Sequence, residues 1–303
     1  MIIETVPNIS EGRNLKLINR IVNKIKLIPG IEIKDIHCDY DHNRSVFTIL
    51  GKPRSVFMTI FTIVDNVIEI LDINKHQGIH PRAGIIDVIP FVPVKNVSYE
   101  KLIIWTEKFA YQFFNKYKIP VYLYSLSSKR PQTKTLSKIR NKGIEFIKNL
   151  SPNDKDYLPD IFEKEIFHPK MGVSFIGTRY PLIAFNFNIE TPNHKTQEIL
   201  SKTKELAKEL RESNGGIKNL QALAFFLPSK KLVQLSTNIL KAHQTDFIKI
   251  YNTIVKKIKE KGLELKESEL VGCIPQPIIE KLIQNYFKLS HFNLKQTINF
   301  HIH

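Results

Sequence analysis

Cysteine is scarce in this chain. Its 303 residues include two cysteines, Cys38 and Cys273, which lie far apart and in no CxxC or Cys/His spacing. A disulfide framework and a zinc site of the usual spacing are therefore not expected. We expect both thiols to be reduced, and we expect no metal.

Long hydrophobic runs are also missing. The longest apolar stretch, residues 56–71, is interrupted by Asp65, Asn66 and Glu69, which would be costly at the centre of a bilayer. The first residues, MIIETVPNIS, lack the basic region and the long apolar core of a secretory signal. We therefore expect a cytoplasmic protein with no membrane partner.

Acidic residues are outnumbered by basic ones. The chain has 45 Lys and Arg against 29 Asp and Glu, a formal charge of +16. Clustered basic residues would indicate nucleic-acid binding through counterion release, but the lysines here are scattered over almost every expected helix. We expect no nucleic-acid partner, because a net positive charge without a cluster of basic residues is weak support for nucleic-acid binding. A positive field can also steer a polyanionic small substrate toward a cleft.

The length and the alternation of elements indicate the fold class. A chain of 303 residues exceeds what one hydrophobic core usually serves, so two domains are expected. Strand and helix patterns alternate in the first half, which is typical of an α/β or α+β layer. The expected strands are 2–6, 31–36, 45–50, 85–94 and 121–124, and the expected helices are 15–26, 56–71, 99–116 and 135–150.

A second set of elements begins near residue 173. It follows the irregular stretch 151–172, and loops of that length are usually functional. The expected strands are 173–177, 182–189, 220–226, 232–236 and 264–270, and the expected helices are 195–213, 246–261 and 276–287. We place the domain boundary near Gly177, which gives domains 1–177 and 178–303.

The most informative segment is KHQGIHPRAGIIDVIPFVPV, in which two histidines precede a buried strand. His76 and His80 have the spacing of a helical metal pair, but Gly78 and Pro81 make a helix doubtful, and no Glu follows the first His as in HExxH. A loop imidazole can instead take and return protons near neutral pH. We favour His80 for that role and expect His76 to brace the loop.

Several motifs in one collinear order resemble the formiminotransferase family. They span residue 4 to about 287 and read VPNISEGRN, DHNRSVFTILG, HQGIHPRAGIIDVIPFVPV, PVYLY, LIAFNFNI, LVQLSTNIL and SELVGCIP. The resemblance implies two subdomains, each a mixed β-sheet covered by helices, with the substrate cleft between them. It also implies a homodimer, tetrahydrofolate as co-substrate without a metal, and a place in histidine catabolism.

The implied reaction moves the formimino group from N-formimino-L-glutamate to N5 of tetrahydrofolate. The second histidine of the family's HQGxHPR motif, its general acid/base, is His80 here. The family's folate-contacting stretch corresponds to EKEIFHPKMG, in which Met171 replaces an aromatic residue. The implied folate contacts are Glu163, Lys164, Glu165, Ile166, Phe167, His168, Pro169, Lys170, Met171 and Gly172. The cyclodeaminase domain of bifunctional relatives is not expected.

Other polar residues are candidates for supporting roles. The tetrahedral intermediate carries positive charge on nitrogen, so Asp39 and Asn43 could stabilise it. Asp39 could equally make a hydrogen-bonded turn. Asn8 and Glu11 follow a strand end, where α/β ligand sites often form, or they could cap the helix that follows.

Arginines are expected to bind the substrates, because both are rich in carboxylates and a guanidinium can contact a carboxylate through two hydrogen bonds. Arg82 ranks first, followed by Arg44 and Arg211. Arg44 could instead pair with a neighbouring carboxylate, and Arg211 could complement the dipole of the helix that it ends.

Three other functions remain open at the level of sequence. A relative that transfers a formyl group or processes 5-formyltetrahydrofolate would use the same histidine. A metal-dependent hydrolase would use His76, His80 and nearby aspartates. A nucleic-acid-binding module would rest on the net charge and the SSKRPQTK patch.

Overall fold

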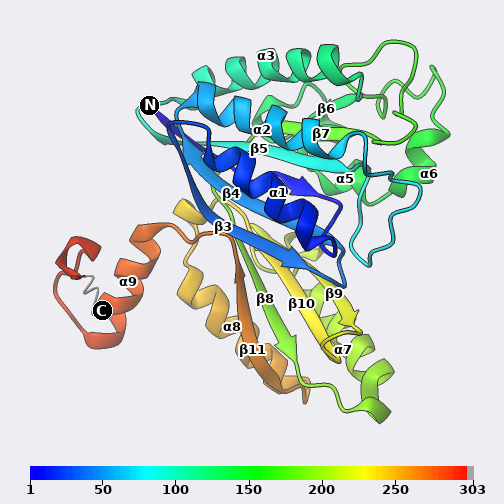
Figure 1. Ribbon diagram of the computed structural model, residues 1–303. Coiled ribbons are helices and arrows are strands. Elements are labelled where there is room, and N and C mark those ends of the chain that lie inside the picture. Colours follow the sequence, from blue (N-terminus) through cyan, green and yellow to red (C-terminus); the bar gives the residue numbers. More distant parts are fainter. Residues whose placement is uncertain (299–303) are drawn as a thin grey trace. The chain divides into compact units, whose positions relative to one another are not determined.

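The computed structural model describes residues 1–298, and the chain divides into two compact units (Figure 1). The first unit is Met1–Arg179, and the second begins at Tyr180. Each unit has its own cluster of buried apolar side chains. Gly177, near which the sequence suggested a boundary, lies inside the last strand of the first unit, and the division follows that strand.

A mixed sheet forms the centre of the first unit. Its order is β1-β4-β2-β5-β7-β6, with β3 paired to β4. The pairs β5–β7 and β6–β7 are parallel, and the others are antiparallel. The mixed sheet expected for this unit is confirmed. The strands are β1 Ile2–Thr5, β2 Asn8–Ile9, β3 Ile31–Asp39, β4 Arg44–Gly51, β5 Ile86–Lys95, β6 Val121–Leu123 and β7 Ser174–Thr178.

Three long helices pack on this sheet (Figure 1): α1 Leu15–Lys26, α2 Pro53–Val67 and α3 Tyr99–Tyr117. Apolar residues recur on one face of each helix, and that face is buried. Asn14 caps α1 by accepting a hydrogen bond from the backbone N–H of Leu17, 3.0 Å away. Ser98 caps α3 in the same way, by accepting from the backbone N–H of Lys101 at 3.3 Å.

The single helix expected over residues 135–150 is wrong. The structure has three short helices there, α4 Pro131–Lys134, α5 Ser137–Arg140 and α6 Gly143–Lys148. Thr135 is extended, and Gly143 has φ of +85°, which a continuing α-helix does not allow. These breaks place Arg140 at the end of a short helix rather than inside a long one.

The second unit has an antiparallel sheet. Its strands are β8 Ile183–Ile189, β9 Leu220–Leu227, β10 Leu232–Ile239 and β11 Leu265–Val271, in the order β11-β8-β10-β9. The mixed sheet expected for this unit is therefore wrong, since all three pairings are antiparallel. The reason is that strands joined through a helix are not neighbours in this sheet. β8 and β9, for example, run in the same direction, but β10 lies between them and pairs with both in the antiparallel sense. This arrangement is a split βαβ pattern.

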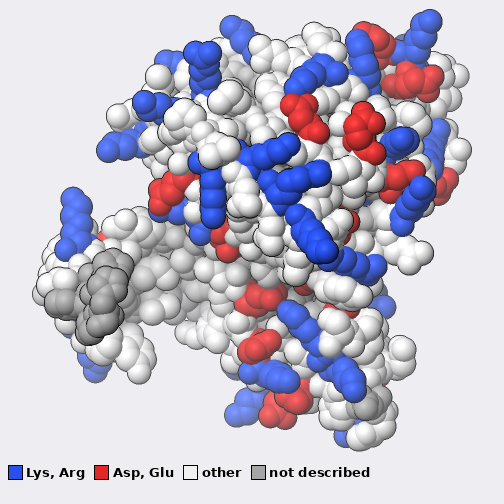
Figure 2. Space-filling view, in the orientation of Figure 1, with Lys and Arg blue, Asp and Glu red and all other residues white. Residues whose placement is uncertain are grey.

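Helices of the second unit are α7 Thr196–Leu210, α8 Phe247–Glu260 and α9 Gln276–Phe287. Asp246 caps α8 by accepting from the backbone N–H of Lys249. Within residues 1–298, no helix is both long and apolar enough to cross a membrane. Figure 2 shows basic side chains spread over the visible face with acidic ones between them, in keeping with the scattered lysines of the sequence.

Candidate active site

Three loops of the first unit meet at Asn43. One follows β2, the second turns between β3 and β4, and the third is the histidine loop, residues 76–82. The Asn43 side chain accepts a hydrogen bond from the N–H of Gly12 and donates one to the carbonyl of Gln77, both at 2.9 Å. Its φ of 48° is left-handed, a conformation that Asn tolerates. Asn43 thus holds the loops together through its buried amide.

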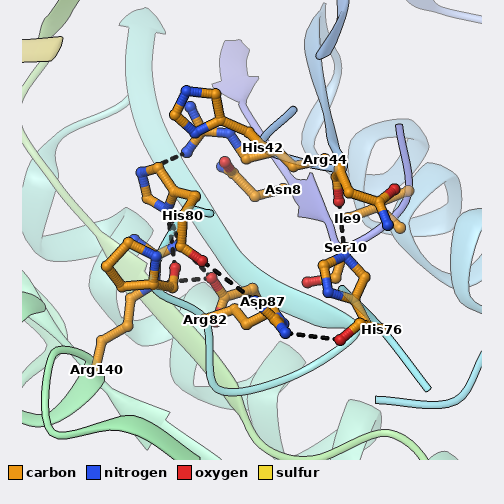
Figure 3. Close-up of a pocket in the computed structure, with 12 residues that line it drawn as sticks. Asn8, Ile9, Ser10, His42, Arg44, His76, His80, Arg82, Asp87 and Arg140 are labelled. Carbon is orange, nitrogen blue, oxygen red and sulfur yellow. Dashed lines mark hydrogen bonds and ion pairs between the residues drawn. The ribbon is translucent and has the colours of Figure 1, made fainter. Parts of the chain in front are cut away.

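A pocket lies among these loops (Figure 3). Candidates from distant parts of the sequence converge there, namely Asn8, Asn43, Arg44, His80 and Arg82. All of the residues that line it belong to the first unit. The other lining residues are Ile9, Ser10, His42, His76, Pro81, Asp87 and Arg140.

His80 stands at one wall of the pocket with both ring nitrogens engaged (Figure 3). Its Nδ1 lies 2.8 Å from the carbonyl oxygen of Pro81, and its Nε2 lies 3.0 Å from a terminal nitrogen of Arg44. Because a carbonyl only accepts and a guanidinium only donates, we assign the proton to Nδ1 and the lone pair to Nε2. The His42 ring is 5.3 Å away, centroid to centroid.

The surroundings of His80 favour its neutral form. Burial lowers the pKa of His80 well below its ordinary value, and Arg44, Arg140 and His42 lower it further. The hydrogen bond to Pro81 acts in the opposite direction. The imidazole is therefore neutral at pH 7, and its Nε2 lone pair accepts the N–H of Arg44.

Arg82 and His76 brace the histidine loop from within. The Arg82 guanidinium donates to the carbonyl of Gly78 at 2.9 Å and to that of His76 at 2.7 Å. His76 donates from Nε2 to the carbonyl of Asn43, 2.7 Å away. Burial lowers the pKa of His76. These contacts agree with the bracing role expected for His76, and they direct the Arg82 guanidinium to backbone oxygens.

Arg140 and Asp87 are site residues that sequence reasoning missed. Asp87 is buried in β5, where one carboxylate oxygen accepts from the N–H of Ala83 at 2.9 Å and the other accepts from Nε of Arg140 at 2.7 Å. A terminal nitrogen of Arg140 lies 3.4 Å from Nδ1 of His80. The signal was present in the sequence: a carboxylate inside the apolar run IIDVIPFV requires a cationic partner.

Asp39 and Glu11 lie near the pocket but contact backbone groups. The Asp39 carboxylate accepts from the N–H of His42 at 2.7 Å, which is turn chemistry. The Glu11 carboxylate accepts from the N–H groups of Arg13 and Asn14, at 2.7 and 2.9 Å. Within residues 1–298, neither of the two is among the residues that line the pocket. The contact of Asp39 supports the turn considered for it, whereas Glu11 holds the loop just before α1 and the cap of that helix is Asn14.

Segment 163–172 contacts residues on both sides of the histidine loop, at Ile73 and Ile85, and it does not line the pocket in the described chain. Met171 is fully buried in the apolar core, and its carbonyl accepts from the N–H of Ile85 at 2.8 Å. Gly172 pairs with Gly84, where backbone approaches so closely that a Cβ on Gly84 would lie 2.0 Å from the carbonyl oxygen of Val173. The N-terminal end of the segment is exposed, and Glu163 forms an ion pair there with Lys118.

Arg211 belongs to the second unit. It follows the last residue of α7, and its Nε donates to the carbonyl of Ala222 at 2.6 Å. This contact joins the helix end to β9. The expected role of Arg211 as a substrate ligand stays a prediction.

The residues considered for a metal site are not grouped as ligands. Among residues 1–298, no set of three or more His, Cys, Asp or Glu side chains is placed to hold a metal ion. His76 and His80 instead contact backbone carbonyls and Arg44.

The fold and the pocket define a class: an α/β protein whose pocket holds a neutral imidazole among guanidinium groups. The chain belongs to the formiminotransferase family. The family's N-terminal subdomain matches residues 2–179, and the formiminotransferase domain that follows matches residues 184–302.

Relatives from bacteria, archaea and animals are similar to the chain. It is 32% identical to a glutamate formimidoyltransferase of Streptococcus pyogenes over 99% of this chain and 98% of that protein. It is 33% identical to a glutamate formimidoyltransferase of Thermoplasma acidophilum over 96% and 94%. It is 31% identical to the formimidoyltransferase-cyclodeaminase of Rattus norvegicus, over 90% of this chain and 50% of that protein.

Proposed function

We propose that this chain transfers the formimino group of N-formimino-L-glutamate to N5 of tetrahydrofolate, releasing 5-formiminotetrahydrofolate and glutamate. The observation that carries the proposal is the identity of 32% and 33%, over nearly the whole chain, with relatives named for this transfer. Tetrahydrofolate is then a co-substrate rather than a resident cofactor. We place the enzyme in the cytoplasm as a homodimer that accepts polyglutamylated folates.

His80 is the proposed general acid/base. As N5 of tetrahydrofolate attacks the formimino carbon, the N5–C bond forms and the N5 proton moves to Nε2 of His80. The same proton then passes to the glutamate nitrogen as the C–N bond breaks. The neutral imidazole, favoured by burial and by two nearby arginines, which lower its pKa, suits the first transfer. Acid/base help of this kind is worth about 10²- to 10⁴-fold in rate.

The other candidate residues receive graded roles in this proposal. Asn43 and Arg82 hold the loops that present His80, as their hydrogen bonds to backbone groups support. Asn8 is assigned a contact with substrate, which its position among the pocket-lining residues supports. Asp39 and Glu11 act through the backbone that they hold, Asp39 in the turn before His42 and Glu11 in the loop before the α1 cap Asn14.

Folate contacts are assigned to residues 163–172, with Arg211 as a further carboxylate ligand. The exposed positions of the segment, among them Lys164 and Lys170, leave side chains available for a ligand. Met171 and Phe167 are buried and would act by shaping the segment.

The proposal is tested by mixing the purified protein with tetrahydrofolate and either formiminoglutamate or formylglutamate, and following the folate product spectrally. We expect turnover with formiminoglutamate and much slower turnover with formylglutamate. The reverse preference would favour the formyl-transferring alternative. Activity that requires an added metal, without folate, would favour the hydrolase alternative.

A further inference from the structure

The pocket beside His80 is positively charged. Arg44, Arg82 and Arg140 line it, and Asp87 is the one carboxylate among its lining residues in the described chain. Asp87 is already held by Arg140, with 2.7 Å between its oxygen and Nε of the arginine. Even without counting its imidazoles, the lining carries more positive than negative charge, and a carboxylate is an anion that arginines bind strongly.

The three arginines differ in what they contact. Arg82 donates to carbonyls of its own loop, and Arg140 donates to Asp87. Arg44 instead places a terminal nitrogen 3.0 Å from Nε2 of His80 (Figure 3). A neutral imidazole nitrogen is a weaker partner for a guanidinium than a carboxylate is. An arriving carboxylate can therefore compete for Arg44.

The chemistry of the donor places a carboxylate at this position. In formiminoglutamate, the α-carboxylate and the nitrogen that leaves are bonded to the same carbon atom. A histidine that protonates this nitrogen must therefore have the α-carboxylate close to its Nε2. Arg44 lies on that side of the imidazole.

We propose that Arg44 binds the α-carboxylate of the donor and that this binding withdraws Arg44 from Nε2 of His80. The inference rests on the proposed function and adds a specificity element to it. In the free protein, the Arg44 N–H donates to Nε2 and occupies the lone pair. With the donor bound, Arg44 donates to the carboxylate, and Nε2 can accept the N5 proton and deliver it to the leaving nitrogen.

This arrangement links donor recognition to catalysis. A donor without the α-carboxylate leaves Arg44 against Nε2, so the base stays blocked even when a formimino group is present. The pocket then discriminates between donors in rate as well as in affinity, because only a donor with the α-carboxylate gains the contact with Arg44 and releases Nε2.

The test compares formiminoglutamate with N-formimino-4-aminobutyrate, which lacks the α-carboxylate, in wild type and Arg44→Ala. We expect wild type to prefer formiminoglutamate by about 10- to 100-fold in kcat/KM. Arg44→Ala lowers kcat/KM for formiminoglutamate by a similar factor and leaves the rate with the analogue unchanged or higher. Arg44→Lys keeps the positive charge but cannot make two parallel hydrogen bonds to a carboxylate. Its kcat/KM for formiminoglutamate should lie between those of wild type and Arg44→Ala. A general structural role would lower both rates equally, and that result would overturn the inference.

A binding measurement separates this inference from the proposed function. Calorimetric titration with L-glutamate and 4-aminobutyrate requires no turnover. We expect glutamate to bind more tightly in wild type and the difference to vanish in Arg44→Ala. Equal affinities in wild type would overturn the inference, even if formimino transfer is observed. Arg13→Ala is the matched control, because Arg13 is exposed and contacts Tyr40 of the neighbouring turn without lining the pocket in the described chain.

Discussion

The histidine loop and segment 163–172 both belong to the first unit, yet they hold their polar groups differently. His80 of the loop lines the pocket and is held by the carbonyl of Pro81 and by Arg44 of β4. The segment buries Met171 in the core and leaves Lys170 exposed. Both were expected to contribute to the site from a resemblance of motifs. In our proposal the loop performs the chemistry and the segment contributes only to binding.

Replacing His80 tests this division with the largest expected effect. His80→Ala removes the proton carrier, so kcat is expected to fall by about 10²- to 10⁴-fold while tetrahydrofolate binding is largely retained. His76→Ala is the matched change in the same loop, and it should cost less than about tenfold, because His76 contacts a carbonyl rather than the reacting atoms. Steady-state rates and folate titrations measure both. Equal losses in the two variants would remove the distinction between them.

Breaking the junction between the two regions should damage both. In Gly84→Ala, the new Cβ would lie 2.0 Å from the carbonyl oxygen of Val173 and 2.9 Å from that of Met171. We expect about 3 kcal/mol of lost stability, measured by denaturant unfolding, because backbone must shift. Gly143→Ala is the control for close approach: nothing lies within 4 Å of the added Cβ, and the expected cost comes from the φ of +85° at Gly143, a conformation that Gly84 does not have. It should cost about 1 kcal/mol. Similar losses in both would mean that the close approach is unimportant.

A substitution in the segment should affect binding alone. Lys170→Ala removes an exposed charge available to a folate carboxylate, so KM for tetrahydrofolate is expected to rise by about three- to tenfold with kcat unchanged. Lys218→Ala, an exposed lysine of the second unit, serves as the control for net charge. A fall in kcat for Lys170→Ala would place the segment in the chemical step.

Much of the fold was readable because local signals agreed with one another. The helices Leu15–Lys26 and Gln276–Phe287 have the predicted bounds, since apolar spacing and flanking turn residues coincide there. Whether neighbouring strands pair in the parallel or the antiparallel sense could not be predicted from local sequence in the same way. The antiparallel sheet of the second unit depends on which strand each crossover skips, and that choice is made by packing between distant segments.

Pocket residues that belong to a recognisable motif could be predicted from the sequence. Pocket residues that are brought together from distant segments could not. His80 stands out in its own loop. Arg140 reaches the pocket only because the region after Thr135 breaks into short helices, and it meets Asp87 from 53 residues away. Asp39 shows the opposite case, since its side chain is satisfied within its own turn.

The pH dependence of the single-turnover rate tests the role of His80 most directly. The pKa of His80 is lowered, so the imidazole is neutral at pH 7 and protonates only below its ordinary range, near 6.5. The wild-type rate constant should therefore be level above about pH 6.5 and fall on the order of tenfold per pH unit below the lowered pKa. In His80→Gln the rate should be at least about 100-fold lower, and this acid limb should be absent. An acid limb that persists in His80→Gln, at a rate near that of wild type, would contradict the account.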